Sequence, residues 1–174
     1  MARQLWLLRH AEAEPHGSRE DSARRLTARG EEQARAAGAA LRALDAGFEA
    51  IFYSPKARAQ QTAELALESF DRDTRERARV YEPLASGFDA AAALELSTML
   101  SADGRLLLVG HEPDLSIVVG QLTGGRVDMK KGGVAVVRLE GAGGELVSLL
   151  RPRELAAIAE SGGVPAGAAV RALD

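Results

Sequence analysis

The chain has 174 residues, enough for one domain with its own hydrophobic core, and we predict a single domain over residues 1–174. Its composition, with 46% hydrophobic and 27% charged residues, is typical of a globular protein. A net charge of -3 and an aromatic content of only 4% argue against a nucleic-acid partner, which would require a basic face and aromatic side chains for stacking. The lack of cysteine excludes thiol catalysis, disulfides and thiolate metal ligands.

The apolar segments of the chain are short. The run over residues 5–8 is too short for the core of a signal peptide, and no segment approaches the length of a transmembrane helix. A chain without cysteine also suits the reducing cytosol. We therefore expect a cytoplasmic protein with no membrane partner.

Three continuous apolar runs predict strands that are buried on both faces, as in a parallel sheet. They cover residues 5–8, 50–53 and 106–109. Each run is followed by a helix signal, and this alternation of strand and helix implies right-handed parallel crossovers. The expected fold is an α/β protein, a three-layer α/β/α sandwich in which helices cover both faces of a sheet.

Capping residues and apolar spacing predict where two helices begin. After a polar loop over residues 11–26, Thr27 is the expected N-cap of the first helix. Its buried face carries apolar residues three and four positions apart, namely Ala34, Ala37, Leu41 and Leu44. Ser54 and Pro55 supply a capping hydroxyl and a first-turn proline for the second helix, which continues through residues 59–67.

The second half of the chain predicts the remaining elements. Residues 79–81 are expected to form a short strand, and Asp89 to cap a helix that ends near Leu100. Two later strands flank a Gly-Ala-Gly-Gly turn and imply antiparallel pairing, hence a mixed, mostly parallel sheet. These strands cover residues 132–139 and 145–150, and they are followed by a helix over 152–161 and a loose tail over 163–174.

Charged and nucleophilic side chains collect where the predicted strands end. Arg9 and His10 follow the first strand, Arg58 opens the helix after the second, and His111 follows the third. Ligands of open α/β sheets bind beyond these carboxyl ends, and guanidinium groups bind phosphate bidentately, so we expect a phosphoryl ligand. His10 could attack phosphorus if an acceptor held its other ring nitrogen protonated, while His111 would bind a phosphoryl oxygen and stabilise charge in the transition state.

Four segments in this order resemble the motifs of the histidine phosphatase superfamily, the group that includes phosphoglycerate mutases. They are LRHAEAE at 8–14, RRLTARGEEQA at 24–34, YSPKARAQQTAEL at 53–65 and LLVGHEPDLS at 107–116. Alanine in place of glycine after the Arg-His pair is similar to the compact SixA-type phosphohistidine phosphatases, and MKKGGVAVVRL at 129–139 resembles a late strand of bacterial members.

The resemblance implies a phosphoglycerate mutase-like fold and a phosphatase that needs neither metal nor cofactor. It implies that His10 is the phosphorylated nucleophile and that His111 is the second histidine of the pocket. Arg9 and Arg58 match phosphate-binding arginines of the family, and Arg24 matches a further arginine that reaches the phosphate in this branch.

One departure from the larger family members concerns the general acid. They supply a glutamate from the region where EPLASGFDA lies, and here Glu82 and Asp89 are only candidates for that role. An alkoxide leaving group needs a proton, so the lack of an acid should slow ester hydrolysis by about 10²-fold or more. The imidazole of a phosphohistidine can leave as a neutral ring near neutral pH.

The favoured partner is therefore a protein that carries phosphohistidine, and the short connections leave room for it to enter. A phosphatase of small phosphorylated metabolites is the alternative, and a non-catalytic phosphate-binding protein is a second one. A mutase is less favoured because the chain shows neither a clear acid nor a long insertion that could cover the pocket.

Other polar residues have simpler interpretations. His16, Glu12 and Glu14 suit a solvated loop, since no carboxylate cluster accompanies them. Glu112 and Asp114 are expected to support the N-terminus of the next helix. The pair at 130–131, two lysines, could attract an acidic partner or could simply be a solvated entry into a strand.

Overall fold

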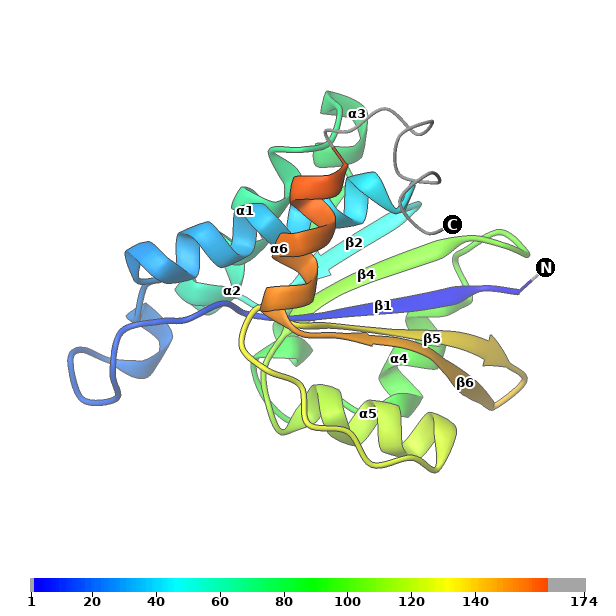
Figure 1. Cartoon of the computed structure of the whole chain (residues 1–174). Helices are drawn as coiled ribbons and strands as arrows, with labels where there is room; N and C mark the ends of the chain where they lie inside the picture. The colour runs from blue at the N-terminus through cyan, green and yellow to red at the C-terminus, as the bar shows by residue number, and fades with distance from the viewer. Residues whose placement is uncertain (1, 163–174) are drawn as a thin grey trace.

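The computed structural model describes residues 2–162, and its centre is one six-stranded sheet (Figure 1). The strands are β1 (Gln4–Arg9), β2 (Ala50–Tyr53), β3 (Ala78–Val80), β4 (Arg105–Gly110), β5 (Val134–Glu140) and β6 (Gly143–Leu150). Their order across the sheet is β3-β2-β4-β1-β5-β6. β1 to β4 run parallel and β5 is antiparallel to both of its neighbours, which confirms the predicted mixed, mostly parallel sheet.

Helices cover both faces of this sheet, as predicted. On one face lie α1 (Ala28–Ala43), α2 (Ala57–Leu67) and α6 (Pro152–Ser161), and on the other lie α4 (Ala90–Ser97) and α5 (Asp114–Thr123) (Figure 1). The side chains of β1 alternate between two apolar clusters: Leu5 and Leu7 pack toward α4 and α5, whereas Trp6 and Leu8 pack toward α1, α2 and α6. Complete burial of one leucine stabilises the fold by roughly 1.5–3 kcal/mol, so this alternation fixes β1 between the layers.

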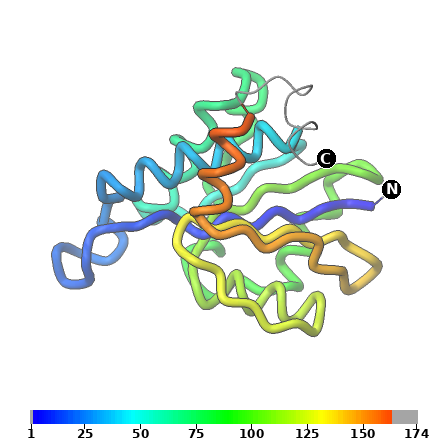
Figure 2. The backbone as a smooth tube through the Cα atoms, in the orientation of Figure 1, coloured from blue at the N-terminus to red at the C-terminus, as the bar shows by residue number. Residues whose placement is uncertain are grey.

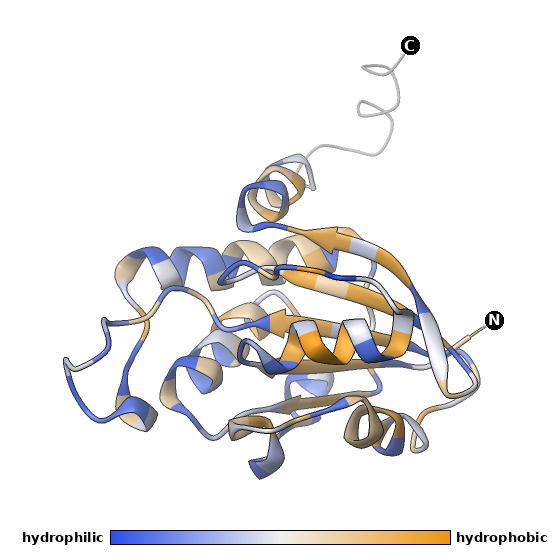
Figure 3. Cartoon of the chain, turned by 90° about the horizontal axis from the view of Figure 1, so that it is seen from below, coloured by the Kyte–Doolittle hydropathy of each residue, from blue (hydrophilic) through white to orange (hydrophobic). Residues whose placement is uncertain are grey.

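The carboxyl ends of the parallel strands point toward one side of the molecule. Figure 2 shows the loop after β1 extending beyond the sheet on that side. Figure 3 shows hydrophobic residues concentrated in the strands and hydrophilic residues along this loop. Three short helices, which the sequence analysis did not predict, lie in the connections: η1 (Asp21–Ala23), α3 (Arg72–Arg75) and η2 (Glu82–Ala85).

Helix α1 begins as predicted and ends one residue early. The Thr27 hydroxyl accepts a hydrogen bond from the amide three residues later, at 3.1 Å. The prediction for Leu44 was wrong: it is the C-cap, and it is 44% exposed because the helix has ended. Gly38 lies where α1 crosses α2, since a Cβ at that position would come within 1.9 Å of the Ala66 carbonyl oxygen. The other predicted residues of this face are buried, namely Ala34, Ala37 and Leu41.

Helix α2 begins at Ala57, so the predicted cap at Ser54 and helix start at Pro55 were wrong. Lys56 is the N-cap, and its side chain makes no capping bond. Ser54 is instead completely buried, and its hydroxyl lies 2.7 Å from a ring nitrogen of His111. The hydroxyl also accepts a hydrogen bond from the Lys56 amide at 3.3 Å, so it combines a local bond with a contact to a residue distant in the chain.

The remaining elements differ from the predictions mainly at their ends. Asp89 caps α4 as predicted, but the helix ends at Ser97 and not near Leu100. Strand β3 begins one residue early, and the turn between β5 and β6 is shorter than expected because two of its glycines belong to β6. Helix α6 spans the predicted residues.

No helix within residues 2–162 is long and apolar enough to cross a membrane. The predicted loose tail at 163–174 lies outside the described residues.

Candidate active site

The two predicted pocket histidines meet at the carboxyl end of the sheet. The last residues of β1 and β4, Arg9 and Gly110, are in register on neighbouring parallel strands. The next residue of each segment is a histidine, so the fold brings His10 and His111 together with ring centroids 5.1 Å apart. Each is only 6% exposed. Parallel pairing therefore produces the juxtaposition that the sequence predicts.

The ring of His10 is oriented by contacts at both nitrogens. Its Nδ1 lies 2.7 Å from the carbonyl oxygen of Ala11, which can only accept, so Nδ1 carries the hydrogen. Nε2 then carries the lone pair, and the Nε–H group of Arg58 donates to it at 3.3 Å. Arg58 lies in the first turn of α2 and is buried. The lone pair of Nε2 is therefore directed at the group that the sequence analysis assigned to phosphate binding.

His111 keeps one ring nitrogen free. Its Nε2 lies 2.7 Å from the Ser54 hydroxyl oxygen, which also accepts a hydrogen bond from the Lys56 amide at 3.3 Å. Within residues 2–162 the Ser54 hydroxyl has no other hydrogen-bond acceptor, so its hydrogen is best donated to Nε2, and the hydrogen of the ring is then on Nδ1. The Nδ1 atom of His111 is buried and has no hydrogen-bond partner among the described residues.

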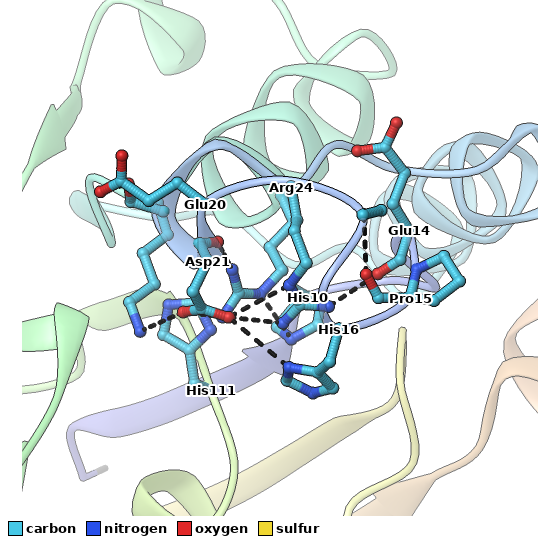
Figure 4. A network of polar contacts seen from close by, with 12 residues as sticks. His10, Glu14, Pro15, His16, Glu20, Asp21, Arg24 and His111 are labelled. Carbon is cyan, nitrogen blue, oxygen red and sulfur yellow. Dashed lines mark hydrogen bonds and ion pairs between the residues drawn. The ribbon is translucent and has the colours of Figure 1, made fainter.

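Three cations converge on the carboxylate of Asp21, in the loop after β1 (Figure 4). Asp21 Oδ1 lies 2.8 Å from Arg24 Nη2, and its Oδ2 lies 3.1 Å from Lys56 Nζ and 3.3 Å from Arg58 Nη2. Hydrogen bonds from Arg24 and Lys56 hold the pKa of Asp21 well below its usual range, so it stays ionised. The exposed ring of His16 lies 3.9 Å from the same carboxylate, as a member of the loop.

Arg9, the last residue of β1, lies close enough to His10 for its charge to lower the pKa of that ring. Its Nη1 donates to the Met129 carbonyl oxygen at 2.7 Å. Its Nε is buried and, like Nδ1 of His111, lacks a partner among residues 2–162. Buried donors are rarely left unpaired, because each costs about 1–3 kcal/mol, and two of them at one predicted anion pocket suit an oxyanion that supplies the missing acceptors.

Burial keeps both histidines neutral. Desolvation lowers the pKa of His10 to about 3, and the neighbouring charge of Arg58 and of Arg9 and the second imidazole act in the same direction. Desolvation also lowers the pKa of His111 to about 3, with Arg58 and Lys56 as the main charged contributors. A neutral His10 has an available lone pair, which a nucleophile requires.

The two candidate acids lie outside this network. Asp89 is exposed, and its carboxylate accepts a hydrogen bond from the Ala92 amide as the cap of α4. Glu82 is exposed in η2. In the described part of the chain, neither carboxylate forms a hydrogen bond or ion pair with His10 or His111, and their assignment as acids stays a prediction.

Other acidic residues stabilise the loops, and for Glu12 and Glu14 this differs from the plainly solvated role that the sequence suggested, since both are half-buried. Glu12 accepts a hydrogen bond from the Thr27 hydroxyl, and Glu14 pairs with Arg19. Glu112 binds the amide and hydroxyl of Ser116 in the first turns of α5. Within residues 2–162, no group of three or more metal-ligating side chains lies together.

Sequence reasoning missed Asp21, Ser54 and Lys56 as pocket residues. Ser54 was interpreted through its local capping potential, and Lys56 was not singled out although it lies two residues before Arg58. Asp21 lies three residues before Arg24, in a loop that gives no periodic signal. Its only sequence-level indication is that it is acidic and close to two arginines, at 24 and 25.

Comparison with known proteins gives a consistent assignment. The family model described as histidine phosphatase superfamily (branch 1) matches residues 5–85. An uncharacterized protein of Picosynechococcus is 34% identical over 143 residues, which cover 78% of this chain and 84% of that protein. A phosphohistidine phosphatase SixA homolog of Haemophilus influenzae is 28% identical over 129 residues, covering 70% of this chain and 78% of the homolog.

The fold is also similar to solved structures. The structure of the protein histidine phosphatase SixA complexed with tungstate superimposes with a TM-score of 0.77 and 24% identity, over 87% of this chain and 99% of that one. The putative phosphohistidine phosphatase SixA of Nakamurella multipartitia superimposes with a TM-score of 0.71 and 26% identity, over 87% and 97% of the two chains. From its sequence relatives and its fold, the chain belongs to branch 1 of the histidine phosphatase superfamily.

Proposed function

We propose that this protein is a phosphohistidine phosphatase that transfers the phosphoryl group to His10 and then to water. The observation that carries the proposal is the pairing of two buried, neutral imidazoles, 5.1 Å apart, with arginine groups. The unpaired donors of Arg9 and His111 add positions for phosphoryl oxygens. Tungstate, which accompanies the similar SixA structure, is a tetrahedral oxyanion of the same kind.

In the first step, the lone pair of His10 Nε2 attacks phosphorus while the P–N bond of the substrate breaks. The hydrogen bond from Nδ1 to the Ala11 carbonyl oxygen holds the ring in this orientation and stabilises the positive charge that develops on it. Arg58 would exchange its bond to Nε2 for one to a phosphoryl oxygen, and the Nδ1–H group of His111 would donate to another.

The leaving group takes the electron pair of the broken bond. If the other ring nitrogen of the substrate is protonated, the ring departs as neutral imidazole and needs no acid from the enzyme. In the second step water attacks the phosphorus on His10, which releases phosphate and restores the neutral ring. No step uses a metal ion or a cofactor, and we place the reaction in the cytosol on the basis of the cysteine-free composition.

A phosphatase of small phosphomonoesters is the second candidate. The observation that favours it is the exposed Glu82 in η2, in the region where larger family members hold an acid. A third possibility, a phosphate-binding protein without turnover, would not require a nucleophilic histidine, since arginines suffice for binding.

The experiment compares phosphorylated histidine-containing carrier protein with a panel of sugar phosphates. We expect release of phosphate from the carrier, loss of turnover in His10→Ala, and unchanged turnover in His16→Ala, which removes the exposed loop histidine as a control. Mass spectrometry of quenched wild-type enzyme should locate an acid-labile phosphoryl group on His10. Turnover of esters with an untouched carrier would reject the proposed substrate, and full activity of His10→Ala would reject the covalent mechanism.

A further inference from the structure

A basic groove of about 480 Å³ lies beside the phosphate pocket. It is formed by four segments that are far apart in the sequence: the end of β1, the first turns of α1, the loop before β5 and the start of α6. Figure 1 shows these segments on the side of the molecule toward which the parallel strands end. The lining includes six cationic side chains, namely Arg9, Arg29, Lys130, Lys131, Arg151 and Arg153.

The positive charge of the groove exceeds the charge of the carboxylates near it. Arg29 lies 3.9 Å from Glu12, and Lys130 pairs with Asp128. Glu154 pairs with Arg151, the N-cap of α6, and with Arg153 in its first turn. The negative charge of Glu112 lies near enough to Arg9 to favour its charged guanidinium form. Four carboxylates thus face six cations, and Lys131 is exposed with no ion pair to any described residue. This concentration is notable in a chain whose net charge is -3.

The groove lies beside the segment that carries the proposed nucleophile, His10. Arg9 lines the groove and precedes His10 in the chain. The amide of Gly132 donates to the carbonyl oxygens of both residues, at 3.1 and 3.0 Å, and so fixes the lysine-bearing loop against His10. Gly132 has a φ of +75°, a conformation that favours glycine. A ligand held by the groove would therefore lie next to the nucleophile.

The lining of the groove indicates what kind of ligand it binds. It contains no aromatic side chain, whereas small-molecule sites enclose their ligands largely with apolar and aromatic residues, and single-stranded nucleic acid requires aromatic stacking. Long, exposed cations spread over an open groove suit the carboxylates of a protein surface, which they attract and orient over several ångströms.

We propose that this groove docks an acidic segment of the phosphorylated protein substrate, and that the enzyme selects phosphohistidines flanked by aspartate and glutamate. This inference rests on the proposed function and adds a basis for choosing among phosphoproteins. For the two lysines at 130–131, the sequence left open either attraction of an acidic partner or a solvated entry into a strand. The proposal chooses the first of these interpretations.

The test uses two phosphohistidine peptides, one with acidic flanking residues and a twin with asparagine and glutamine at those positions, together with phosphoramidate as a small substrate. The groove variant is the double reversal Lys131→Glu and Arg153→Glu. Its matched control is Arg42→Glu and Arg72→Glu, which changes the net charge equally at exposed positions outside the groove.

We expect wild type to prefer the acidic peptide, and the groove variant to lose roughly tenfold or more in kcat/KM for that peptide through KM. Turnover of the neutral peptide and of phosphoramidate should stay within about twofold, and the control variant should behave as wild type. An unchanged preference would overturn the proposal, as would an equal loss on all three substrates. Tighter groove-dependent binding of an RNA oligonucleotide than of the acidic peptide would also overturn it.

The failure of the proposed function would be recognised separately. If wild type hydrolyses neither peptide nor phosphoramidate, the phosphohistidine phosphatase assignment fails, and docking is then measured by fluorescence anisotropy with the unphosphorylated acidic peptide. Binding that the groove variant loses and the control keeps supports the docking surface. No binding by wild type at low ionic strength rejects it.

Discussion

Replacing Asp21 by asparagine should tighten the binding of phosphate. The carboxylate occupies donors of Arg24, Arg58 and Lys56 at 2.8 to 3.3 Å, and these are donors that a phosphoryl group needs. A bound phosphate dianion must therefore either displace Asp21 from these donors or bind next to its carboxylate, which repels it. Asparagine keeps the shape of the side chain and removes that charge.

The size of the effect follows from the exposure of the carboxylate. Asp21 is 47% exposed, so solvent screens its ion pairs, and each is worth at most about 1 kcal/mol. Bound phosphate forms ion pairs with the same donors and so recovers part of the energy of the pairs with Asp21. The net gain in the binding free energy of phosphate is then about 1 kcal/mol. That corresponds to a roughly fivefold lower Kd for inorganic phosphate in Asp21→Asn.

Isothermal titration calorimetry with inorganic phosphate at low ionic strength measures this change. Glu14→Gln is the matched control, because Glu14 lies in the same loop and pairs with Arg19 outside the pocket. Its Kd should equal that of wild type. An unchanged or higher Kd in Asp21→Asn would refute the reasoning, since it would mean that the carboxylate orders the guanidinium groups for phosphate and does not compete with it.

Three further predictions concern stability. Ser54→Ala removes the bond to His111 and should lower the free energy of unfolding by about 1–3 kcal/mol, seen in calorimetry as a drop of roughly 2–4 °C in Tm per kcal/mol; an unchanged Tm would contradict the buried bond. Gly38→Ala should lower the free energy of unfolding, measured by urea titration, by about 1–3 kcal/mol or more, because the new Cβ would lie 1.9 Å from a carbonyl oxygen of α2. The control Gly47→Ala places its Cβ where no atom lies within 4 Å, and its free energy of unfolding should stay close to that of wild type. The folded-state pKa of His10 and of His111 is lowered to about 3, so below about pH 6.5 the unfolded chain binds more protons than the folded one. Between about pH 6.5 and pH 3, the free energy of unfolding should therefore fall by up to about 1.4 kcal/mol per pH unit for each histidine. A variant with both histidines replaced by glutamine should show a shallower fall.

The pocket histidines could be predicted because regular structure alone positions them. Each follows a continuous apolar strand, and neighbouring parallel strands in register end at the same edge of a sheet. Arg58 follows for a similar reason, since it lies within the first turn of a helix that starts at the end of β2. These placements depend on hydrophobic pattern and strand pairing, both of which the sequence displays.

Asp21 and Ser54 could not be predicted in this way, because tertiary contacts decide their roles. The position of Asp21 depends on the path of the loop over residues 11–26. Hydrogen bonds within the loop determine that path, for example the bond from Arg24 to the carbonyl oxygen of Glu14. Ser54 had a good local alternative as a helix cap. In the structure its hydroxyl lies against a buried imidazole 57 residues away and α2 begins only at Ala57, and no local sequence pattern indicates that contact.

The protonation states of the pocket bear directly on the substrate. Asp21 forms ion pairs with Arg24, Lys56 and Arg58, and these cations keep it ionised, so it has no proton to give an alkoxide. His10 and His111 are held neutral by burial and by positive neighbours, so neither is present as an imidazolium acid near neutral pH. The same electrostatics that favour the proposed role of His10 as a nucleophile thus leave these three groups without a proton for an ester leaving group. A leaving group that brings its own proton, as the imidazole of phosphohistidine does, has no such need, and this is the electrostatic argument for proposing that the pocket cleaves P–N and not P–O bonds.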